Sequence, residues 1–264
     1  MNLLRDPIPG LIKKIALPAS IGTLFQTLFN IVDTFFAGTI SAEALSALAK
    51  SFPIYFIIIA ACVGVTVGGT SLIANSIGEN NKSKIHGYFA HTIIYAIIVS
   101  IFITAVGLFF APYLFELMGS ETEVVQLGLS YTNVVFAGSI VFIMLVALNS
   151  LLHADGDTKT YRNVLILSFF LNILLNPLFI FGFGPVPAFG ISGIGIATIV
   201  AQFIGLVIVF IKATKSERIK DISQKDFNFN FKILTNLFFQ SAPISAALLL
   251  ISVGNFIILT YIGV

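Results

Sequence analysis

Apolar residues in this chain gather into long runs that short polar stretches separate. A helix needs about 20 mostly apolar residues to cross the hydrocarbon core of a membrane. Runs of that length occur at 11–37, 51–77, 88–114, 124–151, 161–183, 191–212 and 238–264. The short polar stretches between them make neighbouring spans antiparallel. The pattern therefore predicts an all-α polytopic membrane protein with seven spans.

The composition agrees with this pattern and excludes several other classes of protein. Hydrophobic residues make up 57% of the 264 residues and charged residues 10%, with a mean hydropathy of +1.01. A soluble domain averages about 45–50% apolar and about 25% charged residues. A soluble enzyme, a disordered chain and a nucleic-acid-binding protein are therefore excluded, although the net charge is +2. The single cysteine, Cys62, excludes a disulfide framework.

The basic residues are distributed unevenly between the two sides of the predicted bundle. Under the seven-span arrangement, all of the 14 Lys and Arg residues except Lys50 fall on one side. Lys50 lies in the predicted loop 41–50 on the other side. Loops that face the cytoplasm carry an excess of Lys and Arg. We therefore expect the N-terminus and the loops after the second, fourth and sixth spans to be cytoplasmic.

The seventh span resembles the first when the sequence is shifted by 225 residues. Pro18 then aligns with Pro243, and Asn30 with Asn255. The same shift also aligns Ser20 with Ser245 and Gly38 with Gly263. Because six spans separate the copies, the second copy keeps the orientation of the first, as in parallel repeats of transporters. We interpret the seventh span as the first helix of a second six-helix lobe.

This repeat defines the expected domain organisation. Residues 1–212 form an N-terminal six-helix lobe, residues 213–237 a cytoplasmic linker, and residues 238–264 the first helix of a truncated C-terminal lobe. The remainder of that lobe is expected in a protein of about twice this length. A natural seven-span protein is the alternative.

One acidic residue, Asp33, lies deep within a predicted span, and no Lys or Arg lies in the core of any span. Ionisable residues inside a membrane are costly and commonly functional. Removal from water disfavours the charged form of a carboxyl group. Asp33 is therefore predicted to exchange a proton or to bind a sodium ion. The alternative is an aspartate that only forms hydrogen bonds between helices near the outer surface.

Asparagines form a second set of polar residues within the spans. Asn172 and Asn176 are four residues apart, so both project from one face of a helix. Pro177 follows them and removes one helical hydrogen bond. Two amides facing Asp33 would form a small hydrophilic chamber. For each amide alone, a structural hydrogen bond between helices is an equally good interpretation.

Several segments together resemble the multidrug and toxic compound extrusion (MATE) transporter family. The segments are 17–19, 30–38, 74–78, 147–158, 172–182 and 190–202. The resemblance implies twelve spans in two six-helix lobes, with export of cationic or amphipathic compounds in exchange for protons or sodium ions. It implies no enzymatic activity and no cofactor beyond the coupling ion.

The resemblance also implies roles for individual residues. Asp33 matches the first-helix acid that binds the coupling ion, and Pro18 matches the proline at which that helix bends. The implied cavity and substrate-binding residues are Asn172, Asn176, Thr198, Asn149 and Asn30. No metal site is implied apart from Na⁺ at Asp33. Many members carry an aspartate where this chain has Asn176, so Asp33 is the only carboxylate expected in this lobe.

The sequence thus predicts an ion-coupled antiporter that works by alternating access, in the cytoplasmic membrane of a bacterium or archaeon. Its expected partners are small-molecule substrates, the lipid bilayer and the missing second lobe, without nucleic acid. One alternative is a flippase of the same superfamily for lipid-linked oligosaccharides or polysaccharides. Such a cavity should present several central arginines, and this half has none. A channel or non-transporting membrane subunit is the second alternative.

Overall fold

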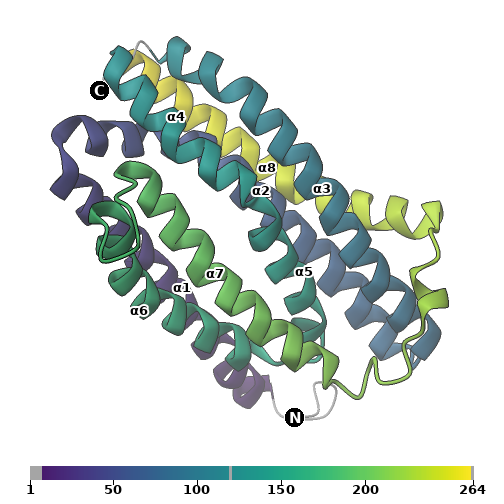
Figure 1. Cartoon of the computed structure of the whole chain (residues 1–264). Coiled ribbons are helices and arrows are strands. Elements are labelled where there is room, and N and C mark those ends of the chain that lie inside the picture. Colours follow the sequence, from purple (N-terminus) through teal and green to yellow (C-terminus); the bar gives the residue numbers. More distant parts are fainter. Residues whose placement is uncertain (1–7, 119–120, 263–264) are drawn as a thin grey trace.

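The computed structural model describes residues 8–118 and 121–262, which form an elongated bundle of helices (Figure 1). Their bounds are α1 (Ile8–Ile40), α2 (Ala42–Gly78), α3 (Lys82–Leu117), α4 (Thr122–Ala137), α5 (Ser139–Ala154), α6 (Thr158–Phe181), α7 (Ile191–Thr214), the 3₁₀ helix η1 (Gln224–Phe227) and α8 (Phe231–Ile262). Strand pairing in these ranges is limited to one bridge, between Phe183 and Val186.

The helices confirm an all-α polytopic membrane protein. Six of them, namely α1, α2, α3, α6, α7 and α8, are long and apolar enough to cross a membrane. Helices α4 and α5 meet the same criterion as a bent pair, which brings the number of spans to seven. The seven apolar runs of the sequence therefore each correspond to a span.

The prediction of one continuous helix over 124–151 is wrong. The chain bends by 41° at Gly138, between α4 and α5. Contacts with α3 stabilise the break, since the Thr104 hydroxyl donates to the Phe136 carbonyl at 2.8 Å and lies 2.8 Å from the Ser139 hydroxyl. These side chains partly replace the backbone hydrogen bonds that the bend removes.

The predicted loop 41–50 is also wrong, because α2 begins at Ala42. Ser41 alone separates α1 from α2, and its side chain accepts a 3.0 Å hydrogen bond from the Ala44 N–H. This is an N-cap, and the Ala, Leu, Glu and Lys residues that follow favour helix. Lys50 therefore lies inside α2 and is buried, with 6% of its surface exposed.

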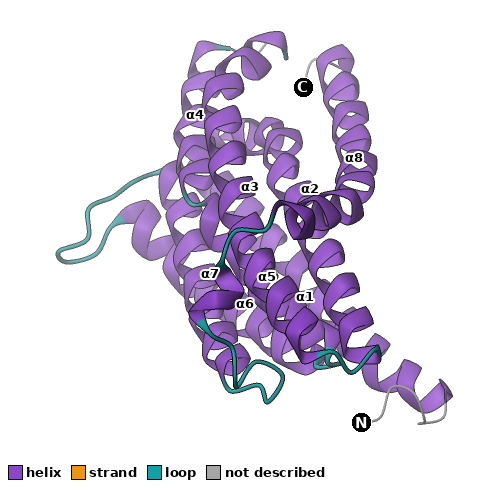
Figure 2. Cartoon of the chain, turned by 90° about the vertical axis from the view of Figure 1, so that its right-hand side faces the viewer, coloured by secondary structure: helices purple, strands orange, loops and turns teal. Residues whose placement is uncertain are grey.

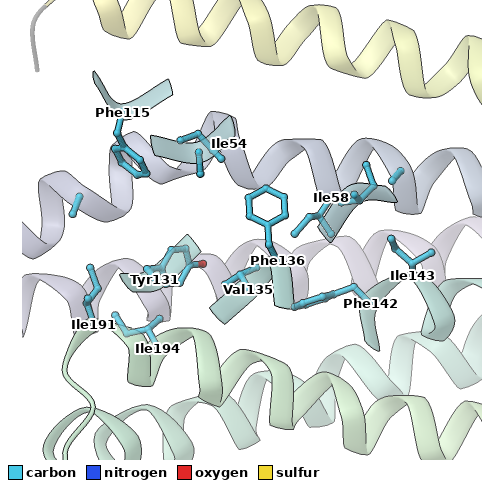
Figure 3. Packing of buried hydrophobic residues seen from close by; sticks show 14 of the residues in the cluster. Ile54, Ile58, Phe115, Tyr131, Val135, Phe136, Phe142, Ile143, Ile191 and Ile194 are labelled. Atoms are coloured by element: carbon cyan, nitrogen blue, oxygen red, sulfur yellow. The ribbon is translucent and has the colours of Figure 1, made fainter. Parts of the chain in front are cut away.

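Helix α2 occupies the middle of the bundle and packs against α3, α4, α5 and α8. Helix α6 packs against α1 and α7, and α5 connects the two groups through contacts with α2 and α7. The core residues in Figure 3 include Ile54 of α2, Phe136 of α4, Ile143 of α5 and Ile194 of α7. Burial of these side chains holds the helices of the lobe together.

Loops rich in basic residues meet at one end of the bundle, where α1 also starts (Figure 1). Lys82 at the start of α3 pairs with Asp221 at 3.4 Å, and Arg218 pairs with Asp155 after α5 at 2.9 Å. Exposed ion pairs of this kind contribute little stability. They show, however, that the loops carrying these basic residues share one side. Which side of the membrane that end faces stays a prediction.

The segment 215–230 between α7 and α8 lies against α3. The N–H of Asn230 donates to Nε2 of His91 at 3.0 Å. In η1, the N–H of Ser223 donates to the Asp226 carboxylate at 2.8 Å, and this bond holds the pKa of Asp226 below its ordinary value. The predicted linker 213–237 thus includes the last turn of α7 and the start of α8. Its independence as a domain boundary stays a prediction.

Helix α8 lies along α2 through an interface of small residues (Figure 2). The hydroxyl of Ser245 donates to the Ala60 carbonyl at 2.9 Å, and that of Ser252 donates to the Pro53 carbonyl at 2.7 Å. Gly64 faces Ser245, and a Cβ at this position would collide with the serine hydroxyl. Small residues of this kind allow membrane helices to approach closely.

Candidate functional site

Asp33 of α1 lies at the centre of a buried hydrogen-bond cluster. Its Oδ1 accepts 2.9 Å hydrogen bonds from the side-chain amides of both Asn172 and Asn176 on α6. Its Oδ2 accepts a 3.2 Å hydrogen bond from the Thr198 hydroxyl on α7. All four residues are buried, and only 6% of Asp33 is exposed. The structure thus brings together these residues, as we expected from helical phase and the family resemblance.

The local geometry of α6 and α7 positions the three donors. Asn172 and Asn176 lie one turn apart on α6, and the Asn176 amide also donates to Asn172 Oδ1 at 3.1 Å. Gly193 brings α7 against the end of α6, because a Cβ there would collide with the backbone of Phe179. This close approach helps to place Thr198 beside the two asparagines.

The cluster neutralises its carboxylate with uncharged groups. No Lys or Arg in the described ranges forms an ion pair with Asp33. Three N–H and O–H donors directed at two carboxylate oxygens suit the ionised form. The Thr198 hydroxyl can also accept a hydrogen bond, so it can turn to accommodate a protonated Asp33.

One acceptor in the cluster is left over. The buried Oδ1 of Asn176 has no hydrogen-bond partner in the structure. A buried acceptor without a partner is costly. Carboxylate, amide and hydroxyl oxygens are also the ligand type that hard cations prefer. The described residues contain no group of three or more His, Cys, Asp or Glu that could hold a metal ion. The oxygens around Asp33 therefore suit a proton or Na⁺.

A cavity of about 500 Å³ adjoins Asp33 between α1, α2, α4 and α8. Its polar lining includes Asn30, Asp33, Tyr131 and Asn255, whereas residues such as Phe52 make the remaining wall apolar. Ligand pockets commonly have volumes of about 300–1,000 Å³ and a mainly apolar lining with few polar groups. The cavity therefore has the size and character of a small-molecule site.

A second cavity of about 330 Å³ lies next to the first. Asn30 and Tyr55 line both cavities, so they form the boundary between them. The second cavity extends between α1, α2, α5, α6 and α7, and its polar lining includes Gln26, Tyr161 and Gln202. Asn30 is thus placed in a cavity wall, as a cavity residue should be.

The structure places two other sequence-predicted residues away from this cluster. Asn149 is buried in α5, its Oδ1 has no partner, and it lines neither of the two cavities. Pro18 lies inside α1, and the helix continues past it to Ile40. A bend at Pro18 stays a prediction, as do the roles in ion and substrate binding.

Sequence reasoning missed several residues of the cavity walls. Gln26 and Gln202 are amides within predicted spans, so their polarity could have singled them out. Asn255 was visible only as the repeat partner of Asn30. Tyr55 and Tyr131 carry no such signal, because tyrosines are common in membrane helices for other reasons.

A polytopic bundle in which a buried carboxylate adjoins cavities has the architecture of half a secondary transporter. The MatE family model matches residues 18–178, and the chain belongs to this family. The match includes Asp33, Asn172 and Asn176. The expected resemblance to the MATE family is therefore confirmed.

Known relatives agree with this membership. A protein described as a FAD transporter of Shewanella oneidensis is 30% identical over 205 residues, which cover 78% of this chain and 45% of the relative. A probable multidrug resistance protein NorM of Thermotoga maritima is 29% identical over 204 residues, which cover 76% and 44%. The chain thus spans about half the length of the curated relatives it matches.

Solved structures give the same result for the fold. The outward-facing conformation of a multidrug resistance MATE family transporter of the MOP superfamily matches with a TM-score of 0.83 and 29% identity, over 94% of this chain and 54% of that one. A MOP superfamily transporter from Pyrococcus furiosus matches with a TM-score of 0.82 and 30% identity, with the same coverage.

Proposed function

We propose that this chain forms the ion-coupling lobe of an antiporter that exports cationic or amphipathic small organic molecules in exchange for H⁺ or Na⁺. The observation that carries the proposal is the position of Asp33, buried among three uncharged donors at the edge of a cavity of about 500 Å³. The protein would lie in the cytoplasmic membrane of a bacterium or archaeon, with its N-terminus in the cytoplasm.

The charge of the cavity favours a cationic substrate. Asp33 is the one acidic residue among the lining residues, and no Lys or Arg is among them. A carboxylate in an apolar surrounding attracts a positive centre strongly because water does not screen it. The apolar walls, which include Leu48, Phe52 and Leu259, suit the hydrophobic body of an amphipathic molecule.

Competition for one carboxylate provides the coupling. When a proton or Na⁺ occupies Asp33, the negative charge that attracts an organic cation is neutralised. When the ion leaves, the charge returns and the site binds substrate again. Because this lobe offers a single buried carboxylate, ion and substrate exclude one another, which is the requirement for exchange rather than co-transport. No further cofactor takes part.

Alternating access would use the second lobe of the protein. Helices α1 and α8 both contain an internal proline, Pro18 and Pro243, and begin the two copies of the repeat. In transporters built from parallel repeats, one bundle rocks against the other around a binding site near the middle of the membrane. The cavity beside Asp33 lies between these two repeat-initiating helices.

The lining of the cavity disfavours the flippase alternative. A lipid-linked oligosaccharide carries a pyrophosphate, which needs Arg or Lys, and neither residue lines this cavity. The relative described as a FAD transporter has a name that implies a diphosphate-containing substrate. The carboxylate of Asp33 does not suit such an anion.

The proposal can be tested with the full-length protein in proteoliposomes. A proton gradient and a sodium gradient are imposed separately, and the movement of tetraphenylphosphonium and of FAD is measured. We expect at least one gradient to drive tetraphenylphosphonium against its own gradient, without movement of FAD. Folded protein that moves neither compound, or only FAD, would overturn the proposal.

A further inference from the structure

Two equivalent helices of the repeat form facing parts of the cavity wall. Each contributes three lining residues, namely Asn30, Asp33 and Thr34 from α1 and Asn255, Ile258 and Leu259 from α8. The shift of 225 residues that aligns the two repeats converts each residue of the first set into one of the second. The cavity is therefore shared by the two repeats at equivalent positions.

The two contributions differ in chemistry. Asp33 corresponds to Ile258, so the carboxylate is present on α1 alone. Asn30 corresponds to Asn255, so both helices present a side-chain amide. The cavity thus has one charged wall, one apolar wall and an amide on each. A molecule bound with its positive centre at Asp33 can meet a second hydrogen-bonding group at Asn255.

Contacts with α2 determine which face of α8 points into the cavity. The Ser252 hydroxyl donates to the Pro53 carbonyl at 2.7 Å, and Pro53 itself lines the cavity. Asn255 and Leu259 follow Ser252 by three and seven residues, so they share its face of the helix. The rotation of α8 that places Asn255 in the cavity is therefore set by a buried hydrogen bond.

The amide of Asn255 is available to a ligand. Its side chain is half-buried and forms no hydrogen bond with any residue of the described ranges 8–118 and 121–262. An amide carries two donors and an acceptor. On a helix whose neighbouring positions are mainly Leu, Ile, Val and Phe, an amide that faces a cavity has no structural partner to explain it.

We propose that Asn255 is a specificity-determining residue, which hydrogen-bonds a polar group of an organic cation whose charge lies at Asp33. This inference rests on the proposed function, because it takes the cavity as the substrate site. The preferred ligand is an amphipathic monocation with a hydrogen-bonding group remote from its charge. Cations without such a group bind through Asp33 and the apolar wall alone.

Two monocations test this assignment by direct binding to the full-length protein in nanodiscs. Ethidium carries two aromatic amino groups, whereas tetraphenylphosphonium has no hydrogen-bonding group. We expect Asn255→Leu to weaken ethidium binding about three- to tenfold, the factor of one neutral hydrogen bond. Binding of tetraphenylphosphonium should change less than about twofold. Val253→Leu is the control, since Val253 is 52% exposed and does not line the cavity.

A gain of binding provides a second test that misfolding cannot imitate. Asn255→Asp places a second carboxylate across the cavity from Asp33. We expect this variant to bind a bis(trimethylammonium)alkane more tightly than the unchanged protein, at one optimal length of the connecting chain. Because both charges are needed, adding Asp33→Asn to this variant should remove the gain.

The outcomes separate this inference from the proposed function. If the unchanged protein binds neither monocation, the cavity is not a cation site and both fail. If it binds both, Asp33→Asn weakens both, and neither Asn255 variant differs from the control, the assignment of Asn255 is wrong while the proposed function stands. Loss of the ethidium preference together with the gain for bis-cations supports the assignment.

Discussion

The side-chain amide of Asn176 donates a 2.9 Å hydrogen bond to Oδ1 of Asp33, a residue 143 positions earlier in the chain. The bond joins α6 to α1 inside the lobe. It also leaves the second polar atom of the Asn176 amide, Oδ1, without a partner beside the carboxylate. The pair therefore combines a structural bond between helices with an unused oxygen at the position proposed for the coupling ion.

The first prediction concerns Asp33→Asn in the full-length protein. Asparagine retains an oxygen that can accept from Asn172 and Asn176, and its new amide can donate to the Thr198 hydroxyl. We therefore expect normal folding and insertion. Asparagine cannot exchange a proton or provide a negative charge, so gradient-driven export should fall to the level of empty liposomes. Near-normal export at equal protein level would remove Asp33 from the mechanism.

The second prediction compares two buried asparagines. Asn172→Leu removes a donor to Asp33 and the acceptor of Asn176, so we expect a loss of about 1–3 kcal/mol of stability and reduced export. Asn149→Leu replaces an amide whose oxygen has no partner and which lines neither cavity, so stability and export should be unchanged or slightly higher. Thermal unfolding and transport assays measure both. Equal losses in the two variants would contradict the placement of Asn149 outside the site.

The third prediction tests the α2–α8 interface. A Cβ at Gly68 would collide with the Ser241 hydroxyl and lie 3.1 Å from the Leu237 carbonyl. Gly68→Ala should therefore displace α8 and cost about 1–3 kcal/mol, as overpacking does. At Gly254 no atom lies within 4 Å of an added Cβ, so Gly254→Ala should be neutral or stabilising through helix propensity. Thermal unfolding in detergent compares the two. A lower unfolding temperature for Gly254→Ala than for Gly68→Ala would be inconsistent with this packing.

The fourth prediction concerns the attachment of segment 215–230 to α3. The ring of His91 is held by the Gly87 carbonyl, 2.8 Å from Nδ1, and its Nε2 accepts from the Asn230 N–H. His91→Phe leaves that N–H without its acceptor, so trypsin should cut within the segment several times faster. His153→Phe is the control, because His153 packs against Tyr161 and makes no contact with the segment that the structure records. Equal cleavage rates in both variants would show that His91 does not hold the segment.

Much of the fold could be predicted from sequence because a membrane imposes local requirements. A span must be about 20 apolar residues long whatever its neighbours are. The spacing of Asn172 and Asn176 likewise assigns both to one face of a helix without reference to other helices. Asp33 stood out because an acidic residue within a span is rare. Each of these signals depends only on residues close together in the chain.

Other features depended on packing between helices that are distant in sequence. The break at Gly138 is stabilised by Thr104 of α3, and the burial of Lys50 follows from the early start of α2 at Ser41. Local polarity alone favoured a continuous helix in the first case and a loop in the second. Tertiary contacts and capping overrode that preference.

By itself, the sequence determined the number of spans, the one-sided distribution of basic residues and the candidate carboxylate Asp33. The tertiary structure decided which amides reach that carboxylate, since it selects Asn172 and Asn176 and leaves Asn149 elsewhere. It also decided that Asn255 faces the cavity. The physical reason is that helical periodicity defines the faces of each helix, whereas the rotation and neighbours of a helix depend on side-chain packing across the whole bundle.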